Sequence, residues 1–124
     1  MRALTILAVL VFASGCASRV ALSEPFEASN ARGEAREQHD RLIELDRTVV
    51  TALRRSSPCE EDLCPVVERI CELSESICSI ATRHAGDREL ESRCADGNRR
   101  CERARERVEE ACGCEDAVEA PAEG

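Results

Sequence analysis

The sequence predicts an all-α fold of three helices, in which the last two helices form an antiparallel hairpin stapled by disulfides. The first observation is arithmetic: the position numbers of Cys71 and Cys101 sum to 172, and so do those of Cys78 and Cys94. Facing residues of two antiparallel helices have a constant sum, and the spacing of seven keeps both cysteines of a helix on one face. The second observation is a turn signal at Gly86, midway between the paired cysteines. Together they predict the disulfides Cys71–Cys101 and Cys78–Cys94.

The first sixteen residues have the layout of an export signal. A positive start precedes an apolar run that is too short to span a bilayer, and Ser14, Gly15 and Cys16 close the segment. The segment resembles the lipobox signal of bacterial lipoproteins, with Ala13 standing where leucine is usual. The resemblance implies that residues 1–15 are a lipoprotein signal peptide and that Cys16 becomes the lipidated first residue of the mature chain.

The same resemblance places the mature chain in the cell envelope, attached to a membrane through its lipid. Cys16 stands far from the other eight cysteines, which fits a separate role as the lipid attachment site. Ala17 and Ser18 lack the aspartate associated with retention in an inner membrane, so the expected address is the outer membrane, facing the periplasm. The alternative is an ordinary secretory signal that is cleaved near Ala17 and takes Cys16 with it.

Composition limits both the core and the partners. Without the signal the chain has 16 arginines and 25 acidic residues, a net charge of −9 with an acylated N-terminus, so no nucleic acid binding is expected. It has no lysine, tyrosine or tryptophan, and Phe26 is its one aromatic residue beyond the signal. A small domain with so few large apolar side chains is marginal from burial alone. Eight cysteines in an exported chain therefore read as structural disulfides.

The expected mature chain begins with a flexible tether over residues 16–28, which shows no apolar periodicity. A three-helix cysteine-rich domain is expected over residues 29–114. Its first helix should run from about Asn30 to Arg55, capped by Ser29 or Asn30. The helix has a broad apolar stripe at three-and-four spacing. The stripe consists of Ala35, Leu42, Ile43, Leu45, Val49, Val50, Ala52 and Leu53.

The second helix should run from Pro65 to about Arg83, with one face for the cysteine partner and another for the first helix. Gly86 and Asp87 then form a glycine cap followed directly by an N-cap, as in a tight turn between helices. The third helix should run from about Arg88 to Ala111.

The third helix has little apolar surface, so the bridges are expected to hold it in place. Gly97 could break this helix. Continuity is favoured because Gly97 faces Ser74, with a sum of 171. Two small residues allow the close backbone approach that disulfides require.

The outer cysteines extend the ladder less regularly. Cys59 with Cys114 sums to 173 and Cys64 with Cys112 to 176, whereas the crossed pairing gives 171 and 178 and fits less evenly. The expected outer disulfides are therefore Cys59–Cys114 and Cys64–Cys112. Residues 115–124 are expected to form an acidic disordered tail.

The hairpin is similar in construction to the coiled-coil-helix-coiled-coil-helix proteins with twin cysteine pairs, although those use a longer spacing. The segments around Cys71, Cys78 and Cys101 also resemble a small, cysteine-rich, helical type of bacterial lipoprotein with no established activity. That resemblance covers about residues 59–114 and implies no catalytic residue.

No catalytic constellation is visible. Cys112-Gly113-Cys114 could suggest a thiol oxidoreductase, but it follows a helix C-terminus and two glutamates, where the local field raises a thiol pKa. A hydrolase would need a nucleophile in a recognisable elbow with a histidine base, and neither is present. We expect no enzyme activity and no cofactor.

A copper-type metal-binding or thiol-buffering protein of the periplasm is the alternative function. Cysteines seven residues apart lie about 10 Å apart on a helix and cannot share one ion, so no metal site is expected. Zinc fits less well, because His39 and His84 lie in separate segments and no Cys-x-x-Cys knuckle exists. The expected function is a non-enzymatic envelope lipoprotein, a structural or protein-interaction module. Its expected partner is an envelope protein or a second copy, through the first helix around Ile43 and Val50.

Overall fold

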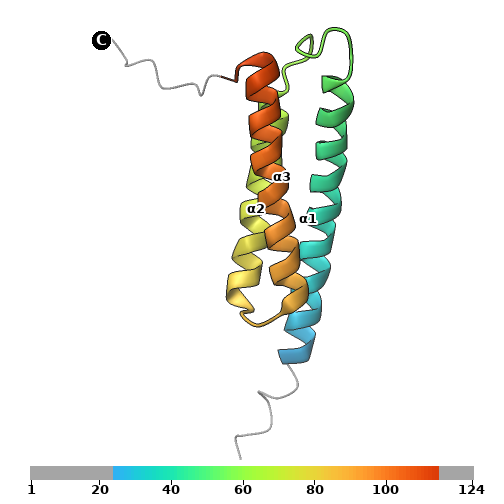
Figure 1. Ribbon diagram of the computed structural model, residues 1–124. Helices are drawn as coiled ribbons and strands as arrows, with labels where there is room; N and C mark the ends of the chain where they lie inside the picture. The colour runs from blue at the N-terminus through green and yellow to red at the C-terminus, as the bar shows by residue number, and fades with distance from the viewer. Residues whose placement is uncertain (1–23, 115–124) are drawn as a thin grey trace, which may run out of the picture.

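Three helices, each antiparallel to the next along the chain, stand side by side in the computed structural model, which describes residues 24–114 (Figure 1). They are α1 (Glu24–Leu53), α2 (Cys64–Arg83) and α3 (Arg88–Cys112), and no strand occurs among the described residues. The chain runs up α1, down α2 and up α3, so α1 and α3 are parallel and α2 is antiparallel to both. The predicted all-α fold with a disulfide-joined α2–α3 hairpin is confirmed.

Local signals set the turn between α2 and α3. Pro65 lies in the first turn of α2, where its missing N–H costs nothing. Gly86 has φ +90°, a backbone conformation that residues with a Cβ rarely adopt. The Asp87 carboxylate then accepts hydrogen bonds from the backbone N–H groups of Glu89 and Leu90, at 3.0 and 3.3 Å. The predicted glycine turn and aspartate N-cap are therefore confirmed, and α3 continues unbroken through Gly97.

The start of α1 differs from the prediction. The helix begins at Glu24 rather than near Asn30, so residues 24–28 of the predicted tether are helical and neither Ser29 nor Asn30 is its cap. Proline is tolerated at the second position of a helix. Acidic residues in the first turn stabilise a helix, because they interact favourably with the positive end of its dipole. Ala31 is buried and extends the predicted apolar stripe, which begins at Ala35, by one turn toward that start. The predicted signal peptide, Cys16, the rest of the tether and the tail at 115–124 lie outside the described residues.

The core lies along the axis of the bundle and receives side chains from all three helices. Its largest fully buried aliphatic side chains are Leu42 and Val49 of α1, Ile70, Ile77 and Ile80 of α2, and Leu90 and Val108 of α3. Leu45 and Leu53 are partly buried and pack against this core. The predicted stripes of α1 and α2 thus meet as expected.

The inner disulfides Cys71–Cys101 and Cys78–Cys94 are confirmed, with Cα–Cα distances of 4.9 and 4.6 Å. Between them Gly97 faces Ser74 so closely that a Cβ on Gly97 would lie 3.0 Å from Ser74 Oγ. The facing backbones of α2 and α3 therefore lie in contact at this level, with no room for a side chain at position 97.

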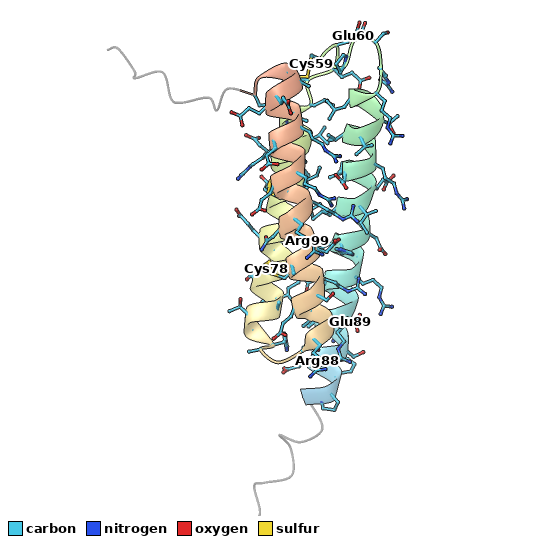
Figure 2. All side chains as sticks on the ribbon, in the orientation of Figure 1. Cys59, Glu60, Cys78, Arg88, Glu89 and Arg99 are labelled. Atoms are coloured by element: carbon cyan, nitrogen blue, oxygen red, sulfur yellow. A yellow bond between two sulfur atoms is a disulfide. The ribbon has the colours of Figure 1, made fainter. Side chains whose placement is uncertain are left out.

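The predicted outer pairing was wrong. The bonds are Cys59–Cys112 and Cys64–Cys114, the crossed alternative. Cys59 lies in the α1–α2 loop beside the end of α3 (Figure 2), so it meets Cys112, the last helical residue. Gly113 then has φ +63° and turns the chain back. Cys114 consequently approaches Cys64 instead of continuing along the helix axis. The constant-sum rule assumes two helices, and neither Cys59 nor Cys114 is helical.

All four disulfides connect α2 or the loop before it with α3 or the residues just after it. None involves a residue of α1. The first helix is thus held by side-chain packing and polar contacts alone.

Candidate functional site

A row of polar contacts joins α1 to α3, and we call it the polar seam. Its pairs are Arg32–Asp87, Arg36–Glu89, His39–Arg93, His39–Asp96 and Asp46–Arg100. Sequence separations in these pairs range only from 53 to 57. A constant difference is what two parallel helices produce, just as a constant sum marks antiparallel ones. The polar seam therefore sets the register between α1 and α3.

The centre of the polar seam is a chain of four partly buried groups. Asp96 Oδ2 lies 2.8 Å from His39 Nε2 and accepts a hydrogen bond from Arg100 Nε at 2.7 Å. Arg100 also donates through Nη1 to Asp46 Oδ2 at 2.6 Å. Both aspartates and the guanidinium are at most one quarter exposed. Charge-assisted bonds at these distances are the strong class of protein hydrogen bonds.

Burial by itself would raise the pKa of Asp96. The hydrogen bonds from Arg100 and His39, together with the Arg100 charge, outweigh burial and lower the pKa of Asp96 from 3.8 to about 2. The same partnership raises the pKa of Arg100, chiefly through its hydrogen bond to Asp96. At the lower end of the seam, hydrogen bonds from Arg93 and Arg36 lower the pKa of Glu89. Asp96, Glu89 and Arg100 consequently stay ionised throughout the neutral range.

His39 is occupied on both ring nitrogens. Arg93 Nη1 lies 3.4 Å from His39 Nδ1, and a guanidinium can only donate. With Nδ1 as the acceptor, Nε2 carries the proton and donates to Asp96. A second Arg93 nitrogen donates to Glu89 at 2.9 Å, which fixes the guanidinium in place.

A hollow of about 350 Å³ opens beside this group and is lined by His39, Glu89, Ser92, Arg93, Asp96 and Arg99. Figure 2 shows Glu89 on the side of α3 that faces α1. Arg93 Nε, on a residue that lines the hollow, is buried and has no hydrogen-bond partner within the described chain. The same holds for Oε1 of Gln38, the neighbour of His39 in the sequence. Ser92 lines the hollow, yet its hydroxyl makes no hydrogen bond to His39. A base for nucleophilic catalysis would need a free imidazole nitrogen aimed at that hydroxyl, and here Arg93 faces the available nitrogen.

The structure separates the cysteines that the sequence placed in one motif. Cys112 and Cys114 bond to Cys59 and Cys64 respectively and not to each other, so Cys112-Gly113-Cys114 is no redox pair in this state. His39 belongs to the polar seam, whereas His84 caps the end of α2. Within residues 24–114 no three His, Cys, Asp or Glu side chains gather into a group that could hold a metal ion.

Sequence reasoning missed the polar seam, although a signal for it was present. Oppositely charged residues of the first and third helices recur at a separation near 54, as Asp46 with Arg100. That pattern becomes visible only once the two helices are taken as parallel. The apolar stripe alone did not indicate it.

Comparison with protein-family models, with curated proteins and with solved structures finds no match. Among the helices of residues 24–114, none combines the length and the apolar content needed to cross a membrane.

Proposed function

We propose that this chain is a non-enzymatic lipoprotein of the bacterial cell envelope that acts as a structural or protein-interaction module. Cys16 carries the lipid, and the three-helix domain stands on the periplasmic side of the outer membrane. The observation that carries the proposal is the disulfide framework: all eight cysteines of the described residues are bonded in four pairs. Such frameworks persist in oxidising compartments outside the cytosol.

The framework also weighs against the alternative of a metal-binding or thiol-buffering protein. Soft metal ions bind thiolates, and a sulfur in a disulfide supplies none. Each bond also has a structural task, because it closes the α2–α3 hairpin or ties down the ends of its helices. The polar seam serves the same purpose between α1 and α3.

Membrane fractionation and intact mass of the purified mature protein test the proposal. The expected result is a chain that begins at an acylated Cys16, partitions with the membrane, and contains no free thiol. Cys16→Ser should abolish acylation and leave the precursor unprocessed. Ala17→Ser provides the matched control, because it changes the neighbouring residue and leaves the lipid attachment site intact.

Two results would overturn the proposal. An unacylated chain that starts at Ala17 or later would exclude the lipid anchor. A reduced native protein that retains stoichiometric copper, and loses it on cysteine substitution, would favour the metal-binding function instead.

A further inference from the structure

One stripe of α1, together with Arg54 in the turn directly after it, points away from the bundle and carries its charges in two blocks. We call it the outer stripe, and all of its residues are exposed. In order along the chain they are Gly33, Glu37, Asp40, Glu44, Arg47, Thr51 and Arg54. Negative charges thus occupy the first part of the stripe and positive charges the end. Residues 47–55, which are the end of α1 and the two residues after Leu53, contain three arginines and no acidic residue.

The charges of the outer stripe make no ion pair within the described chain. The α1 residues on the side of α3, such as Arg32 and Asp46, form ion pairs across the polar seam. By contrast, none of the five charged residues of the outer stripe forms an ion pair with any residue of 24–114. Asp40 also lies one turn from both Glu37 and Glu44, a like-charge spacing that destabilises an isolated helix.

The helix dipole accounts for Arg54, which directly follows α1, but not for the other charges of the stripe. Its influence is confined to the first and last turns of a helix. Glu37, Asp40 and Glu44 lie well inside α1, which starts at Glu24. Arg47 likewise precedes the last turn.

The charge blocks are complementary to themselves when the helix is reversed. Glu37 with Arg54 sums to 91, and so does Glu44 with Arg47. Residues that face each other across two antiparallel helices have a constant sum, so one register aligns both pairs at once. Arg54 is the first residue after α1, and the hydrogen bond from its N–H to Thr51 O at 3.3 Å keeps it in a turn that continues the helix. A two-fold axis at the level of Leu45 and Asp46 produces each pair twice. A parallel arrangement would instead place glutamate against glutamate and arginine against arginine.

We propose that the outer stripe of α1 binds the outer stripe of a second copy of this chain in an antiparallel, two-fold symmetric dimer. The inference rests on the proposed function as an interaction module and names its partner, but it does not depend on the lipid anchor. Ile43 and Val50, which are only partly buried, border the stripe and become covered in the same contact. Because exposed ion pairs are weak and screened by salt, the dimer is expected to be salt-sensitive.

The experiment is sedimentation equilibrium of the full mature chain with its disulfides intact. Association is measured at about 10 mM and about 1 M salt, where the Debye length is about 30 Å and about 3 Å. The expected result is a monomer–dimer equilibrium that weakens by at least about tenfold at high salt.

A charge swap then identifies the surface. The Arg47→Glu/Arg54→Glu variant has an all-acidic stripe, and the Glu37→Arg/Glu44→Arg variant has a predominantly basic one. Each variant alone should dimerise at least about tenfold more weakly than the original chain. An equimolar mixture restores every opposite-charge pair at sum 91, so it should recover association as a heterodimer.

A matched control separates this surface from net charge. Glu68→Arg/Glu75→Arg makes the same change of net charge as Glu37→Arg/Glu44→Arg, but on exposed positions of α2. It should leave self-association unchanged. Three results would overturn the inference: a monomer at every concentration in low salt, self-association that the stripe variants do not alter, or a different envelope protein crosslinked to position 47 in intact membranes. None of these results bears on acylation of Cys16, so failure here is distinguishable from failure of the proposed function.

Discussion

Gly97 of α3 lies against Ser74 of α2 so closely that a Cβ built on the glycine would sit 3.0 Å from Ser74 Oγ, 3.3 Å from its Cβ and 3.4 Å from its Cα. Ser74 is buried, and its hydroxyl donates to Asn98 Oδ1 at 2.7 Å. The contact sits between the two inner disulfides, which prevent the helices from moving apart. Absence of a side chain at position 97 therefore permits both bridges.

Gly97→Ala is expected to destabilise the protein by about 1–3 kcal/mol, because the added methyl overpacks a seam that cannot widen. This outcome opposes the intrinsic helix preference for alanine, which is worth about 1 kcal/mol. Urea denaturation under non-reducing conditions measures the difference.

Gly33→Ala is the matched control, since Gly33 is also helical and nothing lies within 4 Å of its added Cβ. It should stabilise the protein by up to about 1 kcal/mol. Equal effects of the two substitutions would contradict the close approach of α2 and α3.

Leu42→Ala should lower the free energy of unfolding by about 2–5 kcal/mol, because Leu42 is fully buried where α1 meets the hairpin. No disulfide reaches α1, so hydrogen exchange should accelerate in α1 first while α2 and α3 stay protected. Leu45→Ala, at a partly buried position of the same helix, should cost less. Simultaneous loss of protection in all three helices would show instead that α1 does not open separately.

Asp96→Asn should lower the free energy of unfolding by about 2 kcal/mol at neutral pH, since a shift of the pKa from 3.8 to about 2 has about that size. A carboxyl with a depressed folded-state pKa stabilises the fold above its unfolded pKa. That contribution disappears as the pH falls from about 3.8 through about 2. Stability curves across this window should therefore be flatter in the variant. Asp40→Asn, an exposed position without an ion pair among the described residues, should change stability by less than about 0.5 kcal/mol in the monomer.

Cys78→Ser/Cys94→Ser should lower the free energy of unfolding by about 2–4 kcal/mol. The double substitution removes a disulfide whose two cysteines are 16 residues apart in the sequence. The effect should concentrate at the α2–α3 turn, where Cys78–Cys94 is the nearest crosslink. Hydrogen exchange of residues 79–93 under non-reducing conditions measures it. Uniform destabilisation with no local change at the turn would argue that the bridge does not act there.

Patterns that depend on a helix being regular could be predicted from the sequence. The constant sum identified both inner disulfides, and Gly86 with Asp87 located the turn, because each signal follows directly from helix geometry. The outer disulfides could not be predicted in the same way: Cys59 lies in a loop and Cys114 follows a left-handed glycine, where no helical period applies.

Two further differences have physical causes. Helix α1 starts before its apolar stripe begins, so its first turn carries no apolar period that could mark those residues as helical. His39 appeared only as an isolated histidine, since its partner Asp96 lies 57 residues away on a helix whose orientation was not considered.

The absence of any crosslink on α1 determines how the chain would carry a mechanical load. Force applied through the N-terminal end enters α1 first and meets only packing and ion pairs until it reaches Cys59, the first bonded cysteine. Residues 24–58 would then unfold and extend to a length on the order of 100 Å. From Cys59 to Cys114 the disulfides prevent extension, so the hairpin would remain closed after residues 24–58 have been fully extended.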